Sequence, residues 1–99
     1  MAIRAKQGMR TKRPVVVFRA LANTNRLRII GMLLGGKRMT VTDIAVELHI
    51  SFTATSNHLA ILKSLDVLEA LGTAGHVFYS MNEHLPHDFR SIVAVALQK

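Results

Sequence analysis

Four uncharged polar side chains stand close together in the first turns of a helix that we expect to begin at Ser51. Their hydroxyl and amide groups can both donate and accept hydrogen bonds. The major groove of DNA presents donors and acceptors on its base edges, and an Asn side chain can pair with adenine through two hydrogen bonds. We therefore predict that Thr53, Thr55, Ser56 and Asn57 contact bases.

Other kinds of chemistry find little support in the sequence. The chain of 99 residues contains no cysteine, which excludes disulfides, thiolate zinc sites and a cysteine nucleophile. No glycine-rich phosphate loop, carboxylate pair or Ser/His/Asp constellation rises above chance, so we expect neither an enzyme nor a cofactor. The lack of cysteine is compatible with a reducing compartment, and the cytoplasm is the expected location. No segment has the roughly 18 to 20 apolar residues of a membrane span.

Basic residues are concentrated at the start of the chain. Residues 1–38 contain ten Lys and Arg and no acidic residue, whereas residues 39–99 contain three basic and six acidic residues, so the two parts carry net charges of +10 and −3. The asymmetry indicates a polyanionic partner bound by the N-terminal part; the alternative is a solvated tail that serves solubility. Residues 1–13 have no apolar period and are predicted to be a flexible basic arm. They form no amphipathic helix, so we expect no membrane partner.

Two helices are predicted ahead of the polar set. Pro14 suits the first turn of the first helix, because its missing N–H would be unpaired there anyway. Asn23 or Thr24 can cap the second helix, which ends at Gly35 and Gly36.

A short third helix should then lead into the helix that carries the polar set. Thr40, with Asp43 three residues later, approximates a capping box. Residues 49–51 form a tight turn, and Ser51 caps the fourth helix. Two short helices joined by a tight turn constitute a helix-turn-helix unit.

The C-terminal part predicts a hairpin and one more helix. Two strand-like runs, residues 67–71 and 76–81, flank a glycine-bearing turn over 72–75. Such a hairpin after a helix-turn-helix is a wing, and Pro86 starts a last helix with one apolar stripe. The predicted fold class is mainly α with a β-hairpin wing: a winged helix-turn-helix of about five helices plus a two-stranded hairpin. Residues 14–99 form this single domain.

The first and last predicted helices are also candidates for pairing two chains. The first is apolar on more than one face, and the last carries a continuous apolar stripe. We therefore expect a homodimer. Its predicted interface consists of Val16, Val17, Phe18, Leu21, Phe89, Ile92, Val93, Ala96 and Leu97.

Over about residues 16–96 the sequence resembles the ArsR-type family of winged-helix repressors of bacteria and archaea. The resemblance lies in four stretches and in their order: residues 20–30 (ALANTNRLRII), 50–51 (IS), 56–62 (SNHLAIL) and 75–79 (GHVFY). It implies a dimer built from the first and last helices, with the fourth helix of each subunit in the major groove. It also implies repression by occluding a promoter, relieved by an inducer.

The sequence departs from this family at the positions that commonly bind metal. Members often carry Cys-Val-Cys-Asp in the third helix, but residues 40–43 are Thr-Val-Thr-Asp here. Hydroxyls are poor ligands for soft metals, so thiolate-based sensing at this stretch is excluded. His84, His87 and Asp88 are the candidates for the family's second type of site. Their spacing favours surface or capping roles, and we predict no metal site.

The fourth helix and the wing are almost uncharged. Asn57 stands where the family commonly has Arg, and the wing lacks the common arginines and keeps only His76. Phosphate contacts must therefore come largely from the arm, the loop before the third helix and helix N-termini. The predicted phosphate contacts are Arg10, Lys12, Arg13, Lys37, Arg38, Thr40, Thr42, Ser51, His58, Lys63 and His76.

Three of the polar side chains carry a structural alternative. His58 is equally well explained as a polar residue packed at the edge of its helix. For Arg26 and Arg28, a salt bridge or cap is favoured over contact with DNA.

These features predict a sequence-specific regulator of transcription that binds double-stranded DNA. We expect a repressor that binds a pseudo-palindromic operator as a homodimer. The alternative is a winged-helix module that binds another protein and no specific DNA, because its fourth helix and wing are almost uncharged. The sequence identifies neither the operator nor an inducer.

Overall fold

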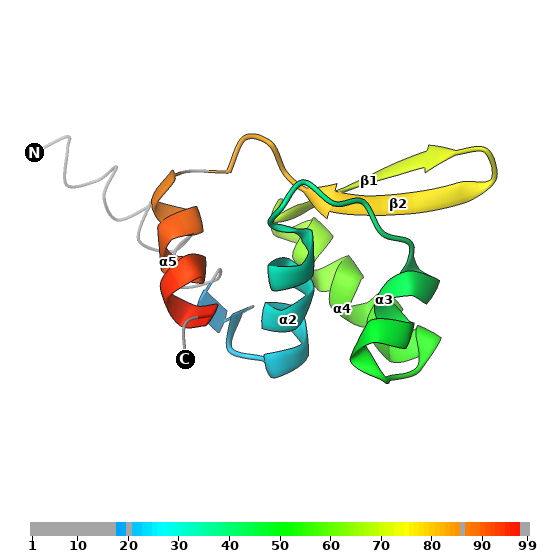
Figure 1. Cartoon of the computed structure of the whole chain (residues 1–99), viewed down its shortest axis with the longest axis horizontal. Helices are drawn as coiled ribbons and strands as arrows, with labels where there is room; N and C mark the ends of the chain where they lie inside the picture. The colour runs from blue at the N-terminus through cyan, green and yellow to red at the C-terminus, as the bar shows by residue number, and fades with distance from the viewer. Residues whose placement is uncertain (1–17, 20, 86, 98–99) are drawn as a thin grey trace, which may run out of the picture.

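The computed structural model describes residues 18–19, 21–85 and 87–97, with the backbone alone for residues 87 and 88. In these ranges four helices and one hairpin follow one another: α2 (Thr24–Leu33), α3 (Val41–Leu48), α4 (Phe52–Ser64), β1 (Leu68–Thr73), β2 (His76–Met81) and α5 (His87–Leu97). The arrangement confirms the predicted winged helix-turn-helix (Figure 1). The predicted arm and most of the first helix lie outside the described residues, although residues 18, 19 and 21 are helical.

Helix α2 begins where its sequence offers a cap. The Asn23 side chain accepts hydrogen bonds from the backbone N–H of Asn25, at 3.0 Å, and of Arg26, at 3.1 Å. Of the two caps predicted, Asn23 is therefore the one used. The bonds satisfy two of the N–H groups that a helix start leaves without a partner.

One hydrophobic core holds the elements together. Helix α2 lies between α5 on one side and α3 with α4 on the other (Figure 1). The core consists of buried side chains from all four helices and from the start of the hairpin. They are Ile29, Ile30, Leu33, Ile44, Leu48, Leu59, Leu62, Val67, Leu68, Phe89 and Val93. Full burial of one such side chain contributes about 1.5 to 3 kcal/mol to folding, so this core fixes how α4 is presented.

Helix α5 packs tightly on α2, which corrects part of the predicted dimer interface. Val93 is completely buried and Phe89 is 8% exposed, because both belong to the core of the single chain. Neither offers surface to a second copy, so the assignment of these two residues to the interface is wrong. Gly31 contributes to the close approach: a Cβ placed there would lie 3.4 Å from both side-chain methyl carbons of Leu97.

The hairpin is longer than the sequence predicts. Thr73 pairs with His76, so the turn contains only Ala74 and Gly75, whose φ angles are 50° and 80°. Two consecutive positive φ angles characterise the type I′ turn, which matches the twist of antiparallel strands. The first strand therefore continues to Thr73, beyond its predicted end at residue 71.

The described helices are short compared with the thickness of a bilayer. None of them is both long enough and apolar enough to cross a membrane.

Candidate nucleic-acid interface

Helix α3 starts with the capping box that the sequence predicts. The hydroxyl oxygen of Thr40 accepts from the Asp43 backbone N–H at 3.1 Å, and the Thr40 N–H donates to the Asp43 carboxylate at 3.2 Å. This reciprocal pair fixes the direction in which the chain enters α3. It also means that Thr40 would offer a phosphate its hydroxyl hydrogen, since the oxygen already accepts a bond.

A short turn connects α3 to α4. His49 adopts a left-handed conformation with φ 57°, and the Ile50 N–H donates to the Ala45 carbonyl at 3.3 Å. Ile50 also packs against the core. Ser51 then caps α4, its hydroxyl accepting from the Ala54 N–H at 3.0 Å. The predicted helix-turn-helix is confirmed, and each of its joints is held by local hydrogen bonds.

One face of α4 is buried, and it includes a residue predicted to contact bases. Thr55 is completely buried with Leu59 and Leu62, and its hydroxyl donates to the Ser51 carbonyl at 2.9 Å. A base edge cannot reach this side chain, so the predicted role of Thr55 is wrong. The hydroxyl braces the first turn of the helix from inside.

The three other residues of α4 that we predicted to contact bases are less buried than Thr55. Thr53 and Asn57 are exposed, and Ser56 is half-buried. Residues four apart lie on the same side of a helix, so Thr53 and Asn57 form one exposed polar stripe over the first two turns. The amide of Asn57 and the hydroxyl and methyl of Thr53 are free to meet another molecule, and their predicted contacts with bases stay predictions.

One exposed residue beside the start of this stripe was not predicted from the sequence. Phe52, the first residue of α4, is 58% exposed. Phe52 lies seven residues before Leu59, a spacing that puts both on the same side of a helix, so the apolar pattern carried no signal that Phe52 is exposed.

His58 is tied to α2. Its Nδ1 lies 3.4 Å from Nη1 of Arg26. A guanidinium can only donate, so a hydrogen bond here requires the neutral ring with its hydrogen on Nε2. Burial, and secondly the positive charge of Arg26, lower the pKa of His58 below its ordinary value of 6.5. The contact supports the structural alternative, while the Nε2–H remains a possible donor to a phosphate.

Arg28 makes a second link across the helices. Its Nη2 donates to the Glu47 carbonyl near the end of α3, at 3.5 Å. A cation near a helix C-terminus is favoured by the helix dipole. The contact agrees with the predicted structural role of this arginine.

The predicted phosphate contacts are spread over several elements. Lys37 and Arg38 are exposed in the loop before α3, and Met39 anchors that loop to β2 through two backbone hydrogen bonds with Tyr79, at 3.0 and 2.8 Å. The others that the structure describes and that are exposed are Thr42, Ser51, Lys63 and His76. Arg10, Lys12 and Arg13 lie outside the described residues.

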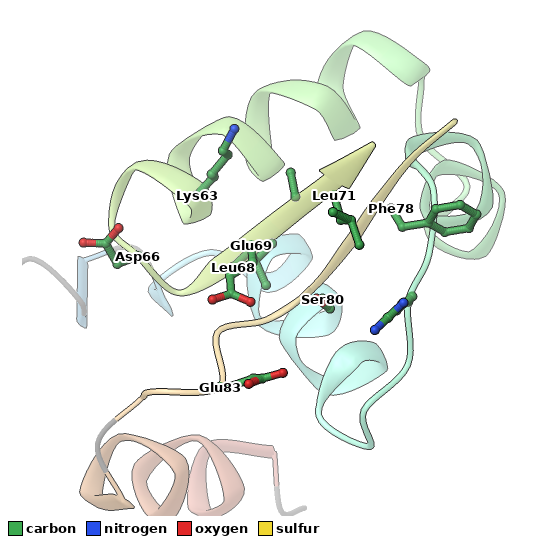
Figure 2. A pocket seen from close by; sticks show the side chains of 10 residues that line it. Lys63, Asp66, Leu68, Glu69, Leu71, Phe78, Ser80 and Glu83 are labelled. Carbon is green, nitrogen blue, oxygen red and sulfur yellow. The ribbon is translucent and has the colours of Figure 1, made fainter. Parts of the chain in front are cut away.

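The outer face of the hairpin has a different character. A hollow of about 510 Å³ lies there, between the end of α4 and the loop before α3 (Figure 2). Asp66, Glu69 and Glu83 contribute carboxylates to it, against the cations of Lys63 and Arg38. Figure 2 shows the three carboxylates at separate points around the hollow. The excess of negative charge opposes a DNA phosphate at this face.

Of the candidate metal ligands, the structure describes one side chain. His84 is exposed, and its backbone N–H donates to the Asn82 side chain at 2.9 Å. The side chains of His87 and Asp88 are outside what the structure describes. Within the described part, no three His, Asp or Glu side chains come close enough together to hold a metal ion.

Known proteins are similar to this chain over the elements that form the helix-turn-helix. The family model for bacterial regulatory proteins of the arsR family matches residues 23–70, from the cap of α2 into β1. The transcriptional repressor SdpR of Bacillus subtilis is 36% identical over 72 residues, which cover 73% of this chain and 79% of SdpR. The transcriptional activator HlyU of Vibrio cholerae is 35% identical over 68 residues, 69% of this chain and 62% of HlyU.

A solved structure extends the similarity to the fold. It is a homodimeric winged helix-turn-helix DNA-binding domain from Mycobacterium bovis, described as a possible ArsR-family transcriptional regulator. It superposes with a TM-score of 0.75 at 26% identity, covering 91% of this chain and 80% of that one.

Proposed function

The chain belongs to the ArsR family of DNA-binding transcriptional regulators, and we propose that it represses transcription by binding a pseudo-palindromic operator as a homodimer. The observation that carries the proposal is the exposed polar stripe of Thr53 and Asn57 on α4. Helix α4 is capped by Ser51 and packed on the core, so it is already folded, and a preformed recognition helix can enter the major groove with little ordering cost.

Selectivity would come from this stripe. The Asn57 amide can donate to N7 and accept from N6 of one adenine, and the Thr53 methyl can touch the methyl of a thymine. Both contacts favour A·T pairs, so we expect A·T content in each half-site. Binding strength would come from the basic residues, chiefly the arm together with Lys37 and Arg38, because phosphate contacts carry most of the sequence-independent affinity.

Dimerisation would use the part of α5 that the core leaves open. Ile92 is 39% exposed and Val95 is 68% exposed. Phe18, in the helical residues before α2, is 48% exposed. Val95 was not among the predicted interface residues, but it follows Ile92 by three residues and so lies on the same side of α5, which supports including it. Two copies joined by α5 would present two α4 helices to half-sites one helical turn, or a multiple, apart.

A comparison of two DNA duplexes tests the proposal. One carries the region upstream of the protein's own gene, and the other is a scramble of equal base composition, both at the same salt concentration. Specific binding should exceed non-specific binding by at least about 10³-fold. Equal weak affinity for both would overturn the proposal and favour a winged-helix module that binds another protein.

Two further measurements test its finer parts. Transcription in vitro from the bound promoter should fall as the protein is added, and a rise would make the protein an activator. Sedimentation at micromolar concentration should show a dimer. A monomer there would remove the basis for a pseudo-palindromic site.

A further inference from the structure

Phe52 is an exposed aromatic residue that the fold does not use. Its side chain is 58% exposed, and it belongs neither to the hydrophobic core nor to the partly buried residues packed against that core. Burial of a Phe side chain would contribute about 1.5 to 3 kcal/mol. The structure forgoes that contribution at the first residue of α4.

The start of α4 is stabilised without Phe52. Ser51 supplies the cap, Thr55 bonds back to the Ser51 carbonyl, and Ile50 fills the adjoining part of the core. The first position of a helix accepts many residue types, because its N–H needs no partner within the helix. Local structure therefore gives no reason for an aromatic side chain at this position.

The position of Phe52 relates it to the polar stripe. It precedes Thr53 directly and lies one turn before Ser56, at the N-terminal end of the helix where the stripe begins. Side chains of an α-helix tilt toward its N-terminus, so the ring of the first residue extends the exposed surface beyond the end of α4. The N-terminal part of a recognition helix is the part that meets base edges.

We propose that Phe52 is a specificity-determining residue that packs against the 5-methyl group of a thymine in the major groove. The inference rests on the proposed function and deepens it. An apolar ring has no hydrogen bond to offer a base, and the methyl of thymine is the apolar group that the major groove presents. An uncharged ring also neutralises no phosphate, so Phe52 would alter base preference while leaving the salt dependence of binding unchanged.

Replacing thymine by uracil removes this methyl group alone. A duplex is first selected from a random library with the full-length chain, and each dT of a half-site is then exchanged for dU in turn. At the thymine that contacts Phe52 in each half-site, the wild type should bind the uracil duplex about fourfold more weakly, the effect of losing one buried methyl-sized group. A thymine that contacts the Thr53 methyl would respond separately, and Thr53→Ser identifies it. Phe52→Ala should bind the parent duplex more weakly and respond no further to uracil at that position. Phe52→Leu, which keeps an apolar side chain, should retain part of the response.

Thr53→Ser is the matched control, because it removes the methyl group of the exposed neighbour and keeps its hydroxyl. It should keep the uracil response that Phe52→Ala loses, and the slope of affinity against salt should be equal in all variants. The inference is overturned if the wild type prefers the selected duplex but tolerates uracil everywhere, or if Phe52→Ala keeps the full response. Failure to enrich any duplex would instead overturn the proposed function, and this inference with it.

Discussion

Helix α4 and the hairpin follow one another in the chain, but the surfaces that they present to solvent differ in charge. The first turns of α4 expose uncharged groups, among them Thr53 and Asn57, whereas the outer face of the hairpin surrounds a hollow with Asp66, Glu69 and Glu83. The first surface offers a DNA backbone no charge attraction, and at the second the three carboxylates outnumber the two cations of Lys63 and Arg38. The difference shows that one winged helix can carry an uncharged surface on its fourth helix and an acidic one beside its hairpin, and we expect the first to be the better suited to DNA.

The largest effect is expected from a segment outside both surfaces. Residues 2–13 contain five of the thirteen Lys and Arg residues. Their deletion should weaken binding to every duplex. It should also reduce the slope of log affinity against log salt concentration by about 0.9 for each phosphate that is no longer neutralised. Dissociation constants measured over a series of salt concentrations check this. A full-length variant with the five cations changed to Gln should behave like the deletion, and an unchanged slope in both would refute the role of the arm.

The next effect tests α4. Asn57→Ala should lose about 1 to 3 kcal/mol of discrimination at one base pair in each half-site, with non-specific affinity nearly unchanged. Binding to a set of single-base operator variants measures this. Thr55→Val is the matched control on the buried face: it should cost about 0.5 to 1.5 kcal/mol of stability, because the hydroxyl bond is removed, and keep the base preference. A uniform loss across all sequences would make Asn57 a backbone contact.

A smaller effect should follow from changing the wing. Glu69 is exposed on β1 and lines the hollow. Glu69→Lys should strengthen binding to any duplex and steepen the salt slope by up to about 0.9, the contribution of one more neutralised phosphate. Glu69→Gln, which only removes the charge, should give a weaker change in the same direction. If neither variant alters the slope, the wing stays away from the DNA.

The smallest effect concerns His58 and pH. Its pKa is lowered in the folded chain, first by burial and then by Arg26. Above the ordinary value of 6.5 the ring is neutral in both states. As the pH falls through that value, the unfolded ring takes up a proton before the folded one, so the free energy of unfolding decreases until the folded pKa is also passed. Urea unfolding at several pH values should show this decrease in the free energy of unfolding. The variant His58→Gln should lack the part of the decrease that His58 contributes. A pH dependence that is identical in the two proteins would exclude this contribution.

The caps and the helix-turn-helix could be predicted because their causes are local. Thr40 and Asp43 are three residues apart and form their capping box within one turn, and the Ser51 hydroxyl likewise accepts from the Ala54 N–H three residues later. The length of the hairpin was harder to predict, because Ala74 has a positive φ angle that is expected of glycine and not of alanine.

The site was predictable in outline but not in its details. Polar residues on α4 identify the surface, yet Thr55 and Thr53 differ in burial although both are threonines. The phase of the helix against the core decides which of them is exposed. The Arg26 to His58 contact joins residues 32 positions apart, and no local pattern predicts such a pair.

By itself, the sequence determined where the helices begin, the order of the elements, the family and the concentration of positive charge before residue 39, since these follow from residue types and short spacings. Only the tertiary structure decided that Thr55, Phe89 and Val93 are buried, that Phe52 is exposed, and that three carboxylates line one hollow beside the wing. The physical reason is that burial depends on which elements pack on which, and this packing joins residues that are distant in the chain.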